Sequence, residues 1–138
     1  MTLYDEVLKI KTYIPIQNYF NSIDIINTIQ PLYPCIVLDK LQTEVTNNYL
    51  TRRYRMYYVN MLKEDLQAIP DLPDNPLKQW SIGEDTLRKI ISQIYFDEGV
   101  DETYTIEYVA QDGNDLCSIC YVDFLMISNN NYCIENVE

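Results

Sequence analysis

Apolar residues in the first fifteen positions repeat with the period of an α-helix. They form a single stripe along it: Leu3, Val7, Ile10 and Ile14. Such a stripe is typical of a helix that packs one side against a core. Thr2 is placed to cap the start of this helix, and Pro15 marks its end. The pattern therefore predicts an amphipathic helix from residue 2 to about residue 14.

The next regular element is predicted after two prolines, in residues 35–41. This short run is rich in β-branched residues, which indicates a buried strand, and the polar residues 42–48 predict the turn that follows it. Residues 49–62 then predict a long strand, in which successive side chains point to opposite faces. Residues 16–34 fit a helix and a strand about equally well, so they receive no assignment.

A proline-rich stretch and a capping pattern divide the middle of the chain. Residues 63–79 contain three prolines, which predicts an exposed and fairly stiff loop. Ser81 and Glu84 have the spacing of a capping box, so a second amphipathic helix is predicted to begin there and to run to about residue 96. Gly99 is available for the left-handed backbone conformation that ends many helices.

The last part of the chain predicts a β-hairpin. Residues 104–110 and 116–128 have strand composition, and turn-forming residues at 111–115 separate them. Both faces of the second strand are largely apolar, so we expect it to be covered on both sides, in a sandwich, under a helix or between subunits. The elements together predict one α+β domain over residues 1–128, with an antiparallel or mixed sheet of about four strands packed by the two helices. A polar arm is predicted over residues 129–138.

Charge is distributed unevenly along the chain. The 138 residues have the length of one domain and a net charge of −11. Residues 1–69 hold seven basic and seven acidic side chains, whereas residues 70–138 hold three basic and fourteen acidic ones. This asymmetry repels nucleic acid and favours either head-to-tail contact between copies or docking to a basic partner. No stretch is apolar enough for a membrane span, and the acidic start differs from a signal peptide, so we expect assembly in the cytoplasm.

Three arginines stand among tyrosines in residues 49–61. In a strand, Arg53 and Arg55 share one face and Arg52 points away from them. Because the cations are divided and the protein is acidic, we expect Arg53 and Arg55 to grip carboxylates of a neighbouring subunit rather than nucleic acid. The single tryptophan is expected either to seal the core or to anchor an interface. The candidate interface residues are Arg53, Arg55, Tyr57, Trp80 and Tyr121.

Side chains that commonly carry chemistry are scarce. The sequence has no histidine, which excludes Ser-His and Cys-His catalysis and histidine-ligated metals. Cys117 and Cys120 have the spacing of a metal or redox motif, but no second cysteine pair accompanies them, and residues three apart in a strand point to opposite faces. Adjacent carboxylates fall at predicted helix ends and loops, where solvation accounts for them. We therefore predict no catalytic residue, no metal site, no cofactor and no enzymatic activity.

The order of the predicted elements resembles a known family. The segments that carry the resemblance are the opening helix MTLYDEVLKIKTYI, the proline-ended segment and strand that follow it, and the closing hairpin YTIEYVAQDGNDLCSICYVDFLMI. They are similar to the tail-completion and tail-terminator proteins of tailed bacteriophages, which build the neck rings that join head to tail. The resemblance implies a structural virion protein of the neck or tail, in a sixfold or twelvefold homo-oligomeric ring. It also implies contacts with other neck, portal or tail proteins, and DNA that passes through the lumen without specific binding.

Two other functions stay open on the sequence alone. An inhibitor could use the acidic half to mimic DNA, and it would bind a basic protein as a monomer or dimer. A small enzyme would instead need a deep pocket with converging carboxylates. The oligomeric state of the native protein separates the ring from these alternatives.

Overall fold

The computed structural model describes residues 1–15, 19–20, 34–61, 74–109 and 117–132. Its elements follow in the order α1 (Leu3–Lys11), β1 (Tyr19–Phe20), β2 (Cys35–Val45), β3 (Tyr49–Met61), α3 (Asp74–Glu98), β4 (Thr105–Val109) and β5 (Cys117–Asn129). Several predictions lie outside the described residues: most of the unassigned stretch 16–34, most of the proline-rich loop, the turn at 111–115 and the end of the polar arm.

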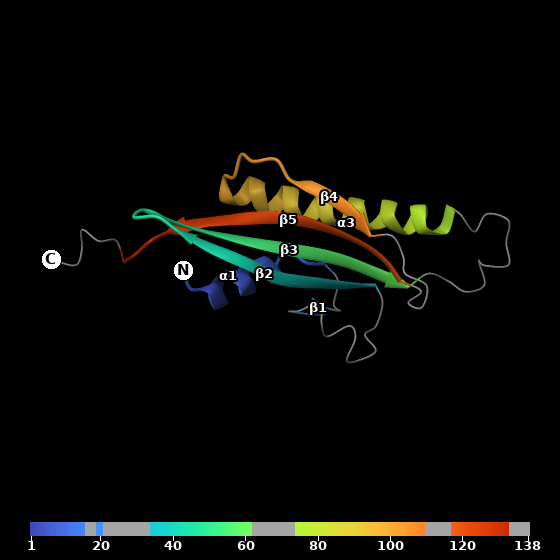
Figure 1. The fold of residues 1–138 in the computed structure, drawn as a ribbon, viewed down its shortest axis with the longest axis horizontal. Helices are drawn as coiled ribbons and strands as arrows, with labels where there is room; N and C mark the ends of the chain where they lie inside the picture. Colours follow the sequence, from blue (N-terminus) through green and yellow to red (C-terminus); the bar gives the residue numbers. More distant parts are fainter. Residues whose placement is uncertain (16–18, 21–33, 62–73, 110–116, 133–138) are drawn as a thin grey trace.

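The strands form one five-stranded sheet in the order β1-β2-β3-β5-β4 (Figure 1). β1 pairs with β2 in parallel, and the other neighbouring strands pair antiparallel, so the sheet is mixed. In Figure 1, α3 runs along β5 and β4, and α1 lies beside β2. The prediction of an α+β fold with a mixed sheet, two packing helices and a C-terminal hairpin is confirmed.

Both helices pack on the same face of the sheet. Even-numbered residues of β3 and β5 point toward this side and are buried, as strand alternation requires. The side chains that join the two helices to the sheet in one core include Ile10 of α1, Leu87, Ile91 and Ile94 of α3, Tyr54, Met56 and Tyr58 of β3, and Val122 and Phe124 of β5. Burying each large apolar side chain stabilises the fold by about 1.5–3 kcal/mol. Neither described helix has an apolar stretch long enough to cross a membrane.

Two helix ends follow local sequence signals. Thr2 caps α1 as predicted, because its hydroxyl accepts a hydrogen bond from the Asp5 backbone N–H at 3.1 Å. Gly99 ends α3 with a φ of 67°, the left-handed conformation expected of it. The predicted end of α1 near Ile14 is wrong, since the helix stops at Lys11 and the chain continues through tighter turns toward Pro15.

The prediction that the second helix starts at Ser81 is wrong. α3 begins at Asp74, so Ser81 and Glu84 lie inside the helix and the end of the predicted 63–79 loop is helical. Pro76 is compatible with this start because it falls in the first turn, where backbone N–H groups have no intrahelical partner. Local capping chemistry at Ser81 is therefore overridden by the packing of a longer helix on the sheet.

β2 is longer than predicted. It continues to Val45, with a β-bulge between Lys40 and Gln42, so only residues 46–48 form the turn. The polar side chains that predicted a turn at 42–48 are exposed along the outer half of the strand. Their polarity indicated contact with water rather than a change of chain direction.

Candidate interaction surface

The odd-numbered residues of β3 and β5 form the sheet face opposite the two described helices. We call this surface the open face, and it consists of Thr51, Arg53, Arg55 and Tyr57 from β3 and Ile119, Tyr121, Asp123, Leu125 and Ile127 from β5. At one end it adjoins a second buried cluster of Cys35, Val37 and Val59, against which Tyr57 and Ile119 pack. An antiparallel sheet that turns one face to water normally carries polar side chains there. On the open face, aliphatic and aromatic side chains are instead mixed with charged ones, and Ile127 is 46% exposed.

A bidentate ion pair lies at the centre of the open face. Arg55 donates from Nε to Asp123 Oδ1 at 2.6 Å and from Nη2 to Oδ2 at 3.0 Å. The guanidinium carbon lies 4.4 Å from the centroid of the Tyr121 ring, and the Tyr57 and Tyr121 centroids are 5.5 Å apart. The hydrogen bond to Asp123 contributes most to holding the pKa of Arg55 above its usual value, and the hydrogen bond to Tyr57 contributes next. The cluster is thus a fixed, half-exposed surface of charge and aromatic rings, the composition typical of protein interfaces.

The expectation for Arg55 is only partly correct, and the one for Arg53 stays a prediction. Arg55 does grip a carboxylate in bidentate fashion, but the carboxylate belongs to the same chain and not to a neighbouring subunit. Arg53 is exposed and makes no ion pair within the part of the chain that the structure describes. Asp123 is the one charged residue of β5, and this isolation in an apolar strand was the signal for its role.

Trp80 lies apart from the other candidate interface residues. It is a half-buried residue of α3 that packs against the core, with its ring 5.7 Å from that of Tyr108 on β4. The structure therefore brings Arg53, Arg55, Tyr57 and Tyr121 onto one face and places Trp80 on the helix-covered side of the sheet. Its surroundings agree with the interpretation in which Trp80 seals the core.

A buried polar cluster that the sequence analysis missed joins α1 to β3. Glu6 is 1% exposed and accepts hydrogen bonds from the Tyr54 hydroxyl and, at 3.3 Å, from Arg52 Nη1. Arg52 Nη2 also donates to the Met1 carbonyl at 3.1 Å. Arg52 thus orients α1 and is not part of the open face. The signal for this cluster was an acidic residue beside the apolar stripe of α1.

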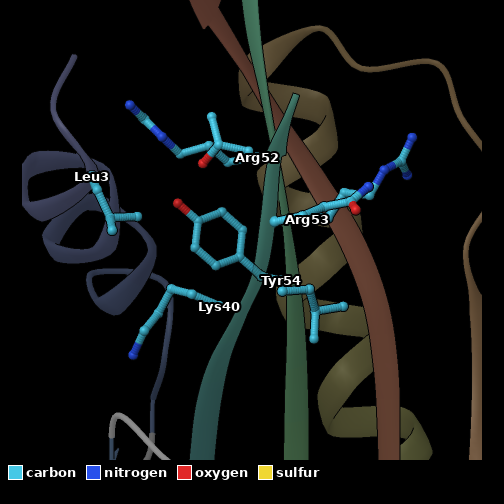
Figure 2. Close-up of a pocket in the computed structure, with 8 residues that line it drawn as sticks. Leu3, Lys40, Arg52, Arg53 and Tyr54 are labelled. Atoms are coloured by element: carbon cyan, nitrogen blue, oxygen red, sulfur yellow. The ribbon is translucent and has the colours of Figure 1, made fainter. Parts of the chain in front are cut away.

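A small cavity of about 120 Å³ lies where α1 approaches the bulge of β2. Figure 2 shows Lys40, Arg52 and Tyr54 pointing toward the α1 side of this cavity, while Arg53 points to the other side of the strand. Pockets for drug-sized ligands usually measure roughly 300–1,000 Å³. The cavity is therefore large enough for a protruding side chain or a few water molecules, and too small for a typical cofactor.

Two observations bear on reactive side chains among the described residues. Cys120 is buried, and this burial raises the pKa of its thiol to about 12, so it is unreactive at neutral pH. Among the described residues, no three possible metal ligands of the His, Cys, Asp and Glu types converge. What the geometry presents is an organised sheet face with exposed apolar, aromatic and charged groups. No protein-family model matches the chain, and no curated protein matches it.

Proposed function

We propose that this protein is a structural subunit of the bacteriophage neck, which assembles into a homo-oligomeric ring around the DNA channel. In this role it acts by contact alone, without catalytic residues or a cofactor. It is assembled in the host cytoplasm and remains in the virion, between other neck, portal or tail proteins. Rings of six or twelve copies are expected.

The observation that carries this proposal is the open face. Half-exposed Tyr57, Tyr121 and Leu125 and exposed Ile127 lie on one side of a sheet whose other side holds the core. Leaving these apolar side chains in water forfeits the stabilisation that their burial would supply. A subunit of a larger assembly buries such a face against its neighbour. Such a contact between subunits would cover β5 on both sides, as its apolar pattern predicts.

Surface charge supports a channel through which DNA slides. All of the excess negative charge lies in residues 70–138. In that half, Asp101, Glu102 and Glu107 are exposed. Carboxylates that face a lumen repel phosphate groups, so DNA passes without being retained.

The same acidic region bears on the alternative of an inhibitor that mimics DNA. No basic residue occupies the last turn of α3, which contains Asp97 and Glu98, and Asp101 and Glu102 follow soon after the helix ends. Two of them are engaged inside the subunit: Asp97 accepts hydrogen bonds from Tyr13 and Gln93, and Glu98 pairs with Lys9. These two carboxylates are therefore less available for mimicry than free ones would be, which favours the ring.

Native mass spectrometry of the purified protein tests the proposal. We expect a closed species of six or twelve subunits, together with rings that have a central opening in negative-stain electron microscopy. A gel-shift assay with double-stranded DNA should show no retention at physiological salt. A protein that stays monomeric at micromolar concentration in low salt would contradict the ring, and tight binding by that monomer to a basic protein would favour the inhibitor.

A further inference from the structure

α1 is apolar on two opposite sides. Its inner side carries Ile10, which is fully buried in the core. Its outer side, which points away from the sheet, carries Tyr4 and Leu8, exposed by 72% and 44%, and Met1, just before the helix, is 45% exposed. Residues three and four positions apart in this way share one face of a helix. A surface helix normally has a polar outer side, whereas a helix that is apolar all round is buried.

The outer side of α1 and the open face lie on opposite sides of the described part of the molecule. α1 packs on one face of the sheet through Glu6 and Ile10, so its outer side points away from that face. The open face lies on the other side of the same sheet. The two surfaces cannot reach each other within one subunit, but one copy can present its α1 to the open face of the next.

We propose that the outer side of α1 in one copy packs on the open face of its neighbour, as the repeated head-to-tail contact of the assembly. Each sheet is then covered by its own helices on one face and by the neighbour's α1 on the other. A contact between two different surfaces closes into a ring when the rotation permits. This inference rests on the proposed function and names the two surfaces that build the ring.

Charge complementarity between the two surfaces selects a second copy as the occupant. Asp5 stands on the outer side of α1 between Tyr4 and Leu8, and its side chain is exposed. Arg53 is the exposed cation of the open face. Within the described residues, neither of them makes an ion pair. In the head-to-tail contact the carboxylate and the guanidinium face each other, with Tyr4 and Leu8 near Leu125 and Ile127.

Other ways of joining two copies account for fewer of these features. Two open faces packed against each other would leave the outer side of α1 exposed in both copies. Pairing through sheet edges is disfavoured by the bulge between Lys40 and Gln42 in β2 and by the five-residue length of β4. Beyond the end of β4, the Tyr95 hydroxyl accepts a hydrogen bond from the Leu125 N–H at 3.2 Å and occupies part of the β5 edge.

Charge reversal tests the contact. Asp5→Arg and Arg53→Glu each place like charges opposite one another, so each should weaken assembly at least about tenfold in low salt. The double variant Asp5→Arg/Arg53→Glu restores opposite charges and should assemble like the wild type. Lys78→Glu changes an exposed charge on α3, away from both surfaces, and should assemble normally. Sedimentation velocity over a concentration series gives the dissociation constants, and circular dichroism verifies that each variant is folded.

Mixing two variants tests the direction of the contact. Leu8→Asp blocks only the outer side of α1, and Ile127→Asp blocks only the open face. Each variant alone should be monomeric. An equimolar mixture should form a one-to-one dimer and stop there, because just one productive pair of surfaces remains.

The outcomes separate this inference from the proposed function. If Leu8→Asp and Ile127→Asp form rings as the wild type does, the head-to-tail contact is overturned, but the proposed function of a ring subunit is not. A mixture that stays monomeric, or a charge-reversed double variant that fails to recover, also overturns the contact. A wild type that is monomeric at all concentrations overturns both.

Discussion

The two faces of the sheet use the same kind of ion pair in different surroundings. On the helix-covered face, Arg52 meets Glu6, and the two side chains are 9% and 1% exposed. On the open face, Arg55 meets Asp123, and the side chains are 31% and 50% exposed. Both arginines belong to β3, and because side chains alternate along a strand, they point to opposite faces of the sheet. The first pair ties α1 to the sheet, whereas the second shapes a surface that water can reach.

The two ion pairs are expected to contribute differently to the stability of the fold. Removing one partner from a buried pair leaves a charge in a medium of low polarity, which costs far more than the pair itself contributes. Removing one partner from an exposed pair leaves a charge that water solvates. The helix-covered face should therefore control folding, and the open face should control what the folded protein contacts.

The largest effect is expected from Glu6→Ala. The substitution leaves Arg52 buried without its carboxylate and also removes the acceptor of the Tyr54 hydroxyl. The free energy of unfolding should fall by about 3–5 kcal/mol. Urea denaturation followed by circular dichroism measures it. The matched control is Glu6→Met/Arg52→Met, which removes both charges and should recover most of the loss, and a loss below about 1 kcal/mol for Glu6→Ala would contradict a buried role.

A smaller loss is expected from Gly83→Ala on the same face. A Cβ at this position would lie 2.5 Å from Cys120 Sγ and 2.8 Å from Tyr58 Cδ1, so α3 or the strands must shift. Overpacking outweighs the better helix propensity of alanine, and we expect a net loss of about 1–2 kcal/mol. Ser81→Ala, at an exposed position of the same helix, should be neutral or slightly stabilising. Equal stability of the two variants would show that the contact between helix and sheet is looser than described.

Asp123→Ala on the open face should have the smallest effect on folding. Arg55 then loses its bidentate partner but remains half-exposed and solvated. The unfolding free energy should change by less than about 1 kcal/mol. Urea denaturation under the conditions used for Glu6→Ala allows direct comparison. If the two substitutions cost the same, the distinction between a structural face and an open face does not hold.

The same comparison explains how much the sequence could predict. A side-chain period of two was enough to place Arg53 and Arg55 on one face and Arg52 on the other. It could not identify Asp123 as a partner, because that requires the register between β3 and β5, which are far apart along the chain. Nonlocal packing also decides where a helix begins.

The capping pattern at Ser81 shows the limit of local rules. It satisfies the spacing of a capping box, but α3 extends back to Asp74. Trp80 could be assigned to the core or to an interface from its type alone, and only its contact with Tyr108 places it. Glu6 stands beside an apolar stripe, yet its buried role depends on an arginine that approaches from β3. In each case the missing information was the distance to a residue remote in sequence.

Two tyrosine hydroxyls on the helix-covered side make the stability of the protein depend on alkaline pH. The Tyr13 hydroxyl donates to Asp97 at 2.8 Å and the Tyr108 hydroxyl to Glu84 at 2.6 Å, which link α1 and β4 to α3. These carboxylates raise the pKa of both tyrosines to about 12, because an ionised phenol would lose the bond and face a like charge.

An unfolded tyrosine ionises near pH 10. With the folded pKa above the unfolded value, the contribution of these bonds is complete below about pH 10 and is lost as the pH rises through 12. Burial also raises the pKa values of Tyr58 and Tyr95, so absorbance titration at alkaline pH should show a group of late-ionising tyrosines that Tyr13→Phe/Tyr108→Phe reduces by two. Urea denaturation across the same pH range should show a smaller decline for that variant than for the wild type. An unchanged titration would mean that these hydroxyls are not bound to carboxylates.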